Sequence, residues 1–290
     1  MEQARALWFI HNDLSGSNDR EALEDVVDHC SACNLRIAYR SSFPSDDLPT
    51  PAILDAGSID LVIVFAGDGT VNATLEALAG WGGEVLILPG GTMNLLYHRL
   101  FGDTEWQDVV RKTGRGELVT RRPGVISTAL GTAYAGLLAG PGTKWNDVRE
   151  AMRKSDVLSM ATETREAFVS TVRDEPLACI EPPLGRREGY PLLLLEPHDD
   201  GFDVYAYHAE STSEFVDQLL ALAQRDFRTG PHDHIGREEK VTLAGVNRHG
   251  FGVLLDGEPG ETEGPAEFAL DTCKVDLLAL NPSPNGENDA

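Results

Sequence analysis

The stretch LVIVFAGDGTVN, residues 61–72, determines the fold class that the sequence predicts. Its first part, Leu61–Phe65, is a continuous apolar run rich in β-branched side chains. Such a run is typical of a strand buried on both faces of a parallel sheet. A tight Gly67-Asp68-Gly69 turn follows, and a helical pattern begins directly after it. We therefore predict a buried strand that leads through a glycine-rich turn into a helix.

The alternation of strand and helix extends to both sides of this stretch. Further strands are expected at Ala6–His11, Leu35–Arg40 and Glu84–Leu88, and helices at Arg20–Cys33, Pro49–Gly57, Asn94–Phe101 and Glu105–Lys112. This alternation is the signature of a doubly wound α/β unit with a parallel sheet. We predict such a domain at residues 1–120.

The pattern changes near Gly116, where shorter apolar segments are separated by many Gly and Pro residues. These segments indicate antiparallel strands of a β-sandwich-like domain. The expected strands include Val125–Leu130, Ala133–Leu138, Tyr190–Glu196, Phe202–His208, Glu239–Ala244, Phe251–Leu255 and Ala266–Leu270, with inserted helices at Lys144–Ser155, Ala161–Val172 and Ser213–Gln224. We assign residues 121–274 to this β-rich domain. Residues 275–290 are expected to form a last strand, which can return to the first domain, and a disordered tail.

Composition excludes several classes of function. The 290 residues carry 24 Lys plus Arg against 47 Asp plus Glu, a net charge of −23. This acidity argues against a nucleic-acid partner and against tight, charge-driven adhesion to an anionic membrane. No window reaches the roughly 18 apolar residues of a membrane span, and no signal-peptide pattern opens the sequence. We expect a cytoplasmic protein whose contact with a membrane surface is peripheral and transient.

A second glycine-rich turn, residues 89–94 (PGGTMN), follows the next predicted strand and again precedes a helix. Glycines let a ligand approach the backbone, and the N–H groups and dipole of a helix start favour phosphate. Asn72 stands where a dinucleotide-binding GxGxxG motif needs its last Gly. Either turn alone is most simply an ordinary strand–helix connection. Both turns at the carboxyl edge of one sheet favour a nucleoside triphosphate site.

These residues resemble the diacylglycerol kinase catalytic-domain family, which includes sphingosine and ceramide kinase relatives. That family carries GGDGTxNE after a buried strand and PxGTxND one strand later. The matching residues here are Gly67-Asp68-Gly69-Thr70 with Asn72, Pro89 with Gly91-Thr92 and Asn94, Asn12 to Ser15-Gly16, and Asp256-Gly257-Glu258. The sequence departs from the motifs at Ala66, and it lacks their acidic side chains at Ala73 and Leu95.

The resemblance implies an enzyme that uses ATP and Mg²⁺ to phosphorylate a hydroxyl of diacylglycerol or a related lipid in a cleft between its two domains. The lipid acceptor would bind the β-rich domain. The residues that would hold ATP are Asn12, Gly67, Gly69, Thr70, Asn72, Gly91, Thr92 and Asn94. Asp256 would be the general base, and Glu258 would support it or the metal. Asp68 would act near the triphosphate as a Mg²⁺ ligand.

Alternatives remain open. An NAD kinase-like phosphotransferase has a similar Gly-Asp-Gly-Thr turn, and a non-catalytic nucleotide- or lipid-binding protein would tolerate the missing acids. Asp256-Gly257 is also a standard hairpin pair. His232-Asp233-His234 fits an exposed loop better than a metal site. The CxxC pair Cys30 and Cys33 fits the end of a helix better than a redox or zinc motif. The acceptor and the oligomeric state are not predicted.

Overall fold

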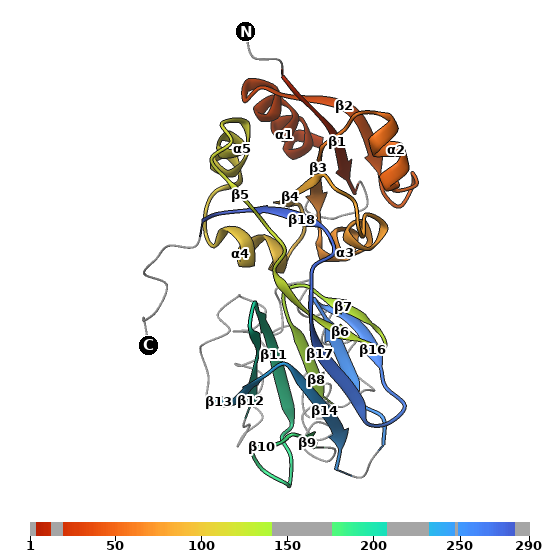
Figure 1. The fold of residues 1–290 in the computed structure, drawn as a ribbon, viewed down its shortest axis with the longest axis vertical. Coiled ribbons are helices and arrows are strands. Elements are labelled where there is room, and N and C mark those ends of the chain that lie inside the picture. The colour runs from red at the N-terminus through yellow and green to blue at the C-terminus, as the bar shows by residue number, and fades with distance from the viewer. Residues whose placement is uncertain (1–3, 13–19, 141–175, 208–231, 247–248, 282–290) are drawn as a thin grey trace. The chain divides into compact units, whose positions relative to one another are not determined.

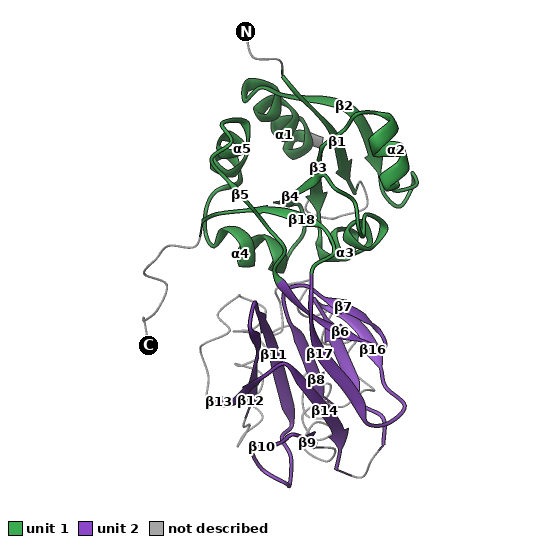
Figure 2. Ribbon diagram, viewed as in Figure 1, with its two compact units in different colours: residues 1–123, 273–290 green, residues 124–272 purple. Residues whose placement is uncertain are grey.

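The computed structural model describes residues 4–12, 20–140, 176–207, 232–246 and 249–281 (Figure 1). The chain divides into two compact units (Figure 2). Unit 1 comprises Met1–Pro123 and Cys273–Ala290, and unit 2 comprises Gly124–Thr272. The three helices expected in residues 144–155, 161–172 and 213–224, and the motif residues Ser15 and Gly16, lie outside the described residues.

Unit 1 contains a six-stranded sheet in the order β2-β1-β3-β4-β18-β5. Its strands are β1 (Arg5–His11), β2 (Leu35–Ser42), β3 (Leu61–Ala66), β4 (Glu84–Pro89), β5 (Val119–Arg121) and β18 (Asp276–Ala279). Neighbouring strands from β2 to β18 run parallel, and β5 pairs antiparallel with β18. Every residue of β3 is buried, which confirms the strand predicted from its apolar run.

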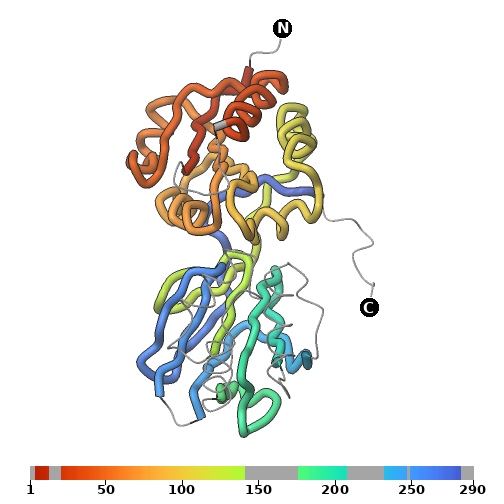
Figure 3. The backbone as a smooth tube through the Cα atoms, turned by 180° about the vertical axis from the view of Figure 1, so that it is seen from behind, coloured from red at the N-terminus to blue at the C-terminus, as the bar shows by residue number. Residues whose placement is uncertain are grey.

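Among the described residues of unit 1, five helices accompany this sheet: α1 (Arg20–Ala32), α2 (Pro51–Ala56), α3 (Asp68–Ala77), α4 (Leu95–Phe101) and α5 (Trp106–Gly114). Helices α1 and α5 pack side by side. The two opposite views show α1 and α5 on one face of the sheet, and α2 and α3 on the other (Figures 1 and 3). The connection from β1 to β2 and that from β3 to β4 run in opposite directions across the sheet. Right-handed crossovers in opposite directions place their helices on opposite faces, so α1 and α3 are expected on different faces, as observed.

The strand order reverses between β1 and β3. The chain leaves β1 for β2 on one side of the sheet, whereas it leaves β3 for β4 on the other. The carboxyl ends of β1 and β3 therefore flank a topological switch point. Open α/β sheets bind their ligands in the crevice at such a point.

The described residues of unit 2 form two antiparallel six-stranded sheets. The first has the order β10-β9-β14-β17-β6-β7 and contains β6 (Gly124–Thr128), β7 (Gly131–Ala133), β9 (Leu177–Glu181), β10 (Pro183–Leu184), β14 (Lys240–Gly245) and β17 (Ala266–Thr272). The second has the order β13-β12-β11-β8-β15-β16 and contains β8 (Leu137–Gly140), β11 (Leu192–His198), β12 (Gly201–Tyr207), β13 (His232–Glu238), β15 (Gly252–Leu255) and β16 (Glu258–Glu261). Side chains from both sheets form one hydrophobic core, among them Val241 and Phe268 from the first and Leu193 and Phe202 from the second.

Two predictions of secondary structure in unit 2 are wrong. The single strand expected at Ala133–Leu138 is two strands, β7 and β8, which belong to different sheets. The segment His232-Asp233-His234, expected as an exposed loop, lies in β13 and pairs with β12. In each case the strand is defined by pairing with strands that are distant in sequence, and local sequence patterns do not reveal such pairing.

Candidate functional site

The two glycine-rich turns of unit 1 meet backbone to backbone. The N–H of Gly90 donates to the carbonyl oxygen of Ala66 at 3.2 Å. A Cβ added to Gly91 would lie 2.4 Å from Cα of Gly67, and one added to Gly90 would lie 2.5 Å from the nitrogen of Ala66. Only glycine fits at such distances. The structure thus brings the turn after β3 and the turn after β4 together at one edge of the sheet.

Asn94 closes the second turn on itself. Its Oδ1 accepts the N–H of Gly91 at 2.7 Å, and its Nδ2 donates to the Gly91 carbonyl oxygen at 2.9 Å. The backbone of Asn94 is left-handed, with φ 52°, a conformation that Asn tolerates better than most residues. The side chain is 8% exposed, so both polar atoms of a nearly buried amide are bound to the main chain of its own turn.

Asp68 connects the two turns through its side chain. It is the first residue of α3, and its Oδ1 accepts the backbone N–H of Leu95 at 2.7 Å. Leu95 is the first residue of α4. The N–H groups of a first helical turn have no carbonyl partner within the helix, so the carboxylate of Asp68 supplies one for α4 from another helix.

Asn12 joins the end of β1 to the same site. Its Nδ2 donates to Oγ1 of Thr70 at 3.1 Å. Thr70 lies in the first turn of α3 and is 5% exposed, and its carbonyl oxygen accepts the hydroxyl of Thr74 at 2.8 Å. The carboxyl ends of β1, β3 and β4 are therefore linked by one set of hydrogen bonds at the topological switch point.

Three other residues with a predicted ATP role also lie here. Gly69 is exposed at the start of α3, Thr92 is exposed in the second turn, and Asn72 is partly exposed on α3. The start of α3 carries the positive end of the helix dipole, which attracts phosphate. All eight predicted ATP-binding residues and Asp68 thus belong to unit 1.

Asp256 and Glu258 lie in unit 2, at the hairpin that connects β15 to β16. Asp256 and Gly257 form its two-residue loop, with φ 48° and 86°, as the Asp-Gly pair predicts. The Asp256 side chain is almost fully buried. Glu258 begins β16 and is partly exposed.

The Asp256 carboxylate binds three successive backbone N–H groups between β7 and β8. Oδ2 accepts from Tyr134 at 2.7 Å, and Oδ1 accepts from Ala135 at 2.7 Å and from Gly136 at 3.0 Å. The N–H of Asp256 in turn donates to the Gly136 carbonyl oxygen at 3.0 Å. Sequence reasoning missed this anchoring contact, because no local signal connects Asp256 with residues 134–136.

The acidic side chain in the two glycine-rich turns fits a metal ion that is bound partly by the phosphates of a nucleotide. Among the residues that the structure describes, no group of three or more His, Cys, Asp and Glu side chains could hold a metal ion. Asp68 is the one acidic residue in the two turns, residues 66–73 and 89–95. Mg²⁺ is usually held by one or two carboxylates together with substrate phosphates, so a single carboxylate beside a phosphate cradle meets this requirement.

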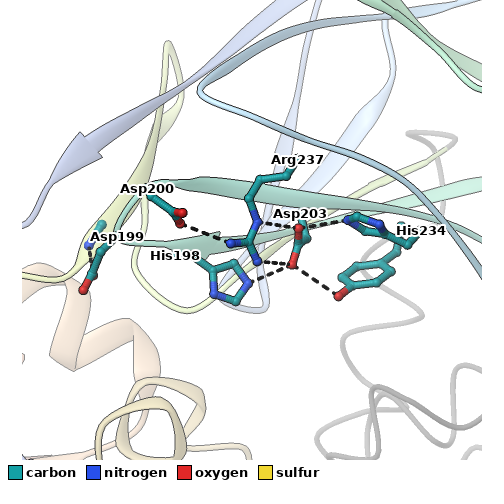
Figure 4. Close-up of polar contacts among 8 residues, drawn as sticks. His198, Asp199, Asp200, Asp203, His234 and Arg237 are labelled. Carbon is teal, nitrogen blue, oxygen red and sulfur yellow. Dashed lines mark hydrogen bonds and ion pairs between the residues drawn. The ribbon is translucent and has the colours of Figure 1, made fainter. Parts of the chain in front are cut away.

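The weaker motif candidates take structural roles. His234 Nε2 lies 2.9 Å from Oδ1 of Asp203 on the neighbouring strand (Figure 4). Arg237 donates from Nε and Nη2 to the two oxygens of Asp203, both at 2.8 Å, and His198 Nε2 lies 3.0 Å from Oδ2. The hydrogen bonds from Arg237 are the main reason why the pKa of Asp203 lies well below its usual range. We call Asp203, His198, His234 and Arg237 the Asp203 cluster.

The CxxC pair lies at the end of α1. Cys30 is buried, and burial raises the pKa of its thiol to about 12. The N–H of Cys33, just beyond the helix, bonds the carbonyl oxygens of His29 and Cys30. A thiol that resists ionisation is a poor nucleophile and a poor metal ligand, so Cys30 belongs to the packing of α1.

Comparison with known proteins finds a family match for the first part of the chain. Residues 6–121 match the family described as diacylglycerol kinase catalytic domain. The matched segment runs from β1 to β5 and contains both glycine-rich turns. This match confirms the resemblance seen in the motifs.

Solved structures extend the likeness to the rest of the chain. A crystal structure of a diacylglycerol kinase from Bacillus anthracis str. Sterne is 16% identical, with a TM-score of 0.60, and the alignment covers 97% of this chain and 98% of that one. Another structure from the same organism, assigned to this activity only provisionally, is 17% identical, with a TM-score of 0.59 and coverages of 97% and 99%. At this identity the likeness shows a shared fold. A comparison with curated proteins finds no match.

Proposed function

We propose that the protein is an ATP-dependent, lipid kinase-like phosphotransferase. It would move the γ-phosphate of ATP to a hydroxyl of diacylglycerol or a related lipid. The observation that supports this proposal is the backbone contact between Gly67 and Gly91, which joins two glycine-rich turns at the switch point of a parallel sheet. The match of residues 6–121 to the diacylglycerol kinase catalytic-domain family supports the choice of reaction.

The phosphates of ATP would lie against the turns, close to the start of α3. The absence of a side chain at Gly67 and Gly69 lets phosphate oxygens approach backbone N–H groups, and the helix dipole adds to their attraction. Such a cradle explains how a chain with a net charge of −23 can bind a polyanion. Mg²⁺, when bound, would neutralise charge on the phosphates. Asn12, Thr70, Asn72, Thr92 and Asn94 complete the proposed ATP set.

The proposed general base is Asp256, with Glu258 as its support. Phosphoryl transfer depends mostly on positioning and charge neutralisation, so the base needs only to reach the attacking hydroxyl. The lipid acceptor would bind unit 2. None of the helices in the described part of the chain is both long and apolar enough to cross a membrane. We propose that the protein reaches lipid by transient, peripheral contact.

A non-catalytic nucleotide-binding role is the second candidate. Ala73 and Leu95 stand where the family motifs carry acids, and the carboxylate of Asp256 already accepts three backbone hydrogen bonds. A protein with these features could keep the ATP cradle without transferring phosphate. The two candidates agree on ATP binding and differ on turnover.

The test is transfer of radiolabelled γ-phosphate from Mg-ATP to a lipid extract, followed by diacylglycerol, a sphingoid base and NAD as separate acceptors. We expect label in a lipid, and ATP binding by calorimetry. ATP binding without transfer to any acceptor would favour the non-catalytic candidate. Label in NAD alone would favour an NAD kinase-like enzyme. Absence of ATP binding would contradict the proposal altogether.

A further inference from the structure

We propose that Asp68 is a positioning residue: its carboxylate locks the start of α4, and with it the second glycine-rich turn, onto the first turn. This inference rests on the proposed function for its catalytic meaning, but the lock itself is independent of any ligand. It gives Asp68 a role besides the one expected of it as a metal ligand. The proposal follows from a closed ring of contacts within unit 1.

The ring begins at the backbone contact between the turns. Gly67 directly precedes Asp68, and Gly91 lies so close to Gly67 that an added Cβ would overlap Cα of Gly67. This contact holds the beginning of the second turn. Backbone contact alone does not fix the end of that turn, where the chain enters α4.

Asn94 carries the constraint across the second turn. Its two hydrogen bonds to Gly91 fix residues 91–94 as one rigid loop. The next residue is Leu95, whose N–H is bound by Asp68 at 2.7 Å. The path therefore runs from Gly67 to Gly91, through Asn94 to Leu95, and back through Asp68 to its neighbour Gly67.

The hydrogen bond between the Leu95 N–H and the Asp68 carboxylate is well suited to hold the start of α4 in place. Asp68 binds a backbone N–H, so the contact does not depend on which side chain residue 95 carries. The contact can therefore form with Leu95, where the family motif has an acid. A hydrogen bond to a charged carboxylate is also about twice as strong as a neutral one. Without it, the start of α4 would lose its acceptor, and the second turn could move away from the first.

The experiment compares Asp68→Asn with Asp68→Ala, because Asn keeps an oxygen for the Leu95 N–H and removes the charge. ATP affinity is measured by calorimetry with Mg²⁺ and again with a chelator. We expect Asp68→Ala to weaken binding roughly ten- to hundredfold under both conditions, and Asp68→Asn to weaken it only about two- to fivefold. Glu76→Gln, an exposed acid on the same helix, is the matched control and should bind like the wild type.

If Asp68→Asn binds ATP as weakly as Asp68→Ala, and both bind like the wild type once Mg²⁺ is chelated, the proposal is overturned and Asp68 acts as a metal ligand alone. Hydrogen exchange at the Leu95 amide provides a readout without nucleotide. Slow exchange in the wild type and in Asp68→Asn, with fast exchange in Asp68→Ala, would support the lock. Equal exchange in all three would refute it, even if ATP binding, and so the proposed function, had already failed.

Discussion

Gly91 is a residue at which one added carbon atom should have a measurable effect. We expect Gly91→Ala to lower ATP affinity at least tenfold, because its Cβ would lie 2.4 Å from Cα of Gly67 and force the turns apart. Forced separation in a tightly packed region typically costs about 1–3 kcal/mol of unfolding free energy. Calorimetry with Mg-ATP and urea denaturation measure the two effects.

Gly82 is the matched control, since a Cβ there has no atom within 4 Å. Gly82→Ala should leave both the ATP affinity and the unfolding free energy close to those of the wild type. If Gly91→Ala behaves like Gly82→Ala, the turns do not form a cradle that depends on their contact.

Asp256 is the residue at which anchoring and catalysis make different predictions. For a general base, Asp256→Asn should lower turnover by roughly 10²–10⁴-fold and leave ATP affinity unchanged, because the ATP residues lie in unit 1. We expect this result in a phosphate-transfer assay. Glu261→Gln, an exposed acid at the other end of β16, is the control.

For an anchor alone, the same substitution would act through folding. An amide has one oxygen where the carboxylate has two, so Asp256→Asn would lose an acceptor for the N–H groups of Tyr134, Ala135 and Gly136. A fall in unfolding temperature with unchanged turnover per folded molecule would remove Asp256 as the base.

At the scale of elements, the Asp203 cluster ties together β11, β12 and β13. The pKa of Asp203 is lowered in the folded protein, chiefly by hydrogen bonds from Arg237 and further by that from His234. A lowered folded pKa contributes stability above the pKa of the unfolded chain, about 3.9 for Asp. That contribution is lost as the pH falls towards the folded pKa.

We therefore expect Asp203→Asn to remove part of the acid sensitivity of the protein. Urea denaturation from neutral pH down to about pH 3 should show a shallower loss of unfolding free energy in this variant than in the wild type. Glu188→Gln, at an exposed site in the same unit, should follow the wild-type curve. Parallel curves for the wild type and Asp203→Asn would contradict the assigned role.

Elements of unit 1 were predictable because their signals are local. The run Leu61–Phe65 and the glycine turn that follows predict β3 and the start of α3 from adjacent residues. In unit 2, the backbone between β7 and β8 binds the carboxylate of Asp256, far along the chain. No pattern within Ala133–Leu138 could reveal that contact, just as His234 gave no sign of its partner Asp203.

The same limit applies to the candidate site. The sequence identified the glycines of both turns and the polar residues around them, because the same local pattern, a buried strand followed by Gly and then a helix, occurs twice in succession. It did not reveal that Asn94 and Asp68 bind backbone groups, because a motif specifies which residues occur and not which atoms they contact. Side chains expected to face a ligand turn out to shape the loop as well.

At the scale of the whole molecule, unit 1 is discontinuous in sequence, and unit 2 is inserted between its two segments. The chain leaves unit 1 after Pro123 and returns at Cys273. The returning strand β18 lies between β4 and β5 in the sheet. The residues matched by the family end at 121, before this strand is made.

The position of β18 has a consequence for how the protein is made and divided. During synthesis, β5 emerges from the ribosome long before the strand that connects it to the rest of its sheet, so unit 1 completes its sheet only after unit 2 has been translated. A gene fragment that stops at Pro123 would encode both phosphate turns but leave β4 with an open edge and β5 without its neighbour. A fragment meant to contain unit 1 alone therefore needs the returning segment, Cys273–Ala290, as well as Met1–Pro123.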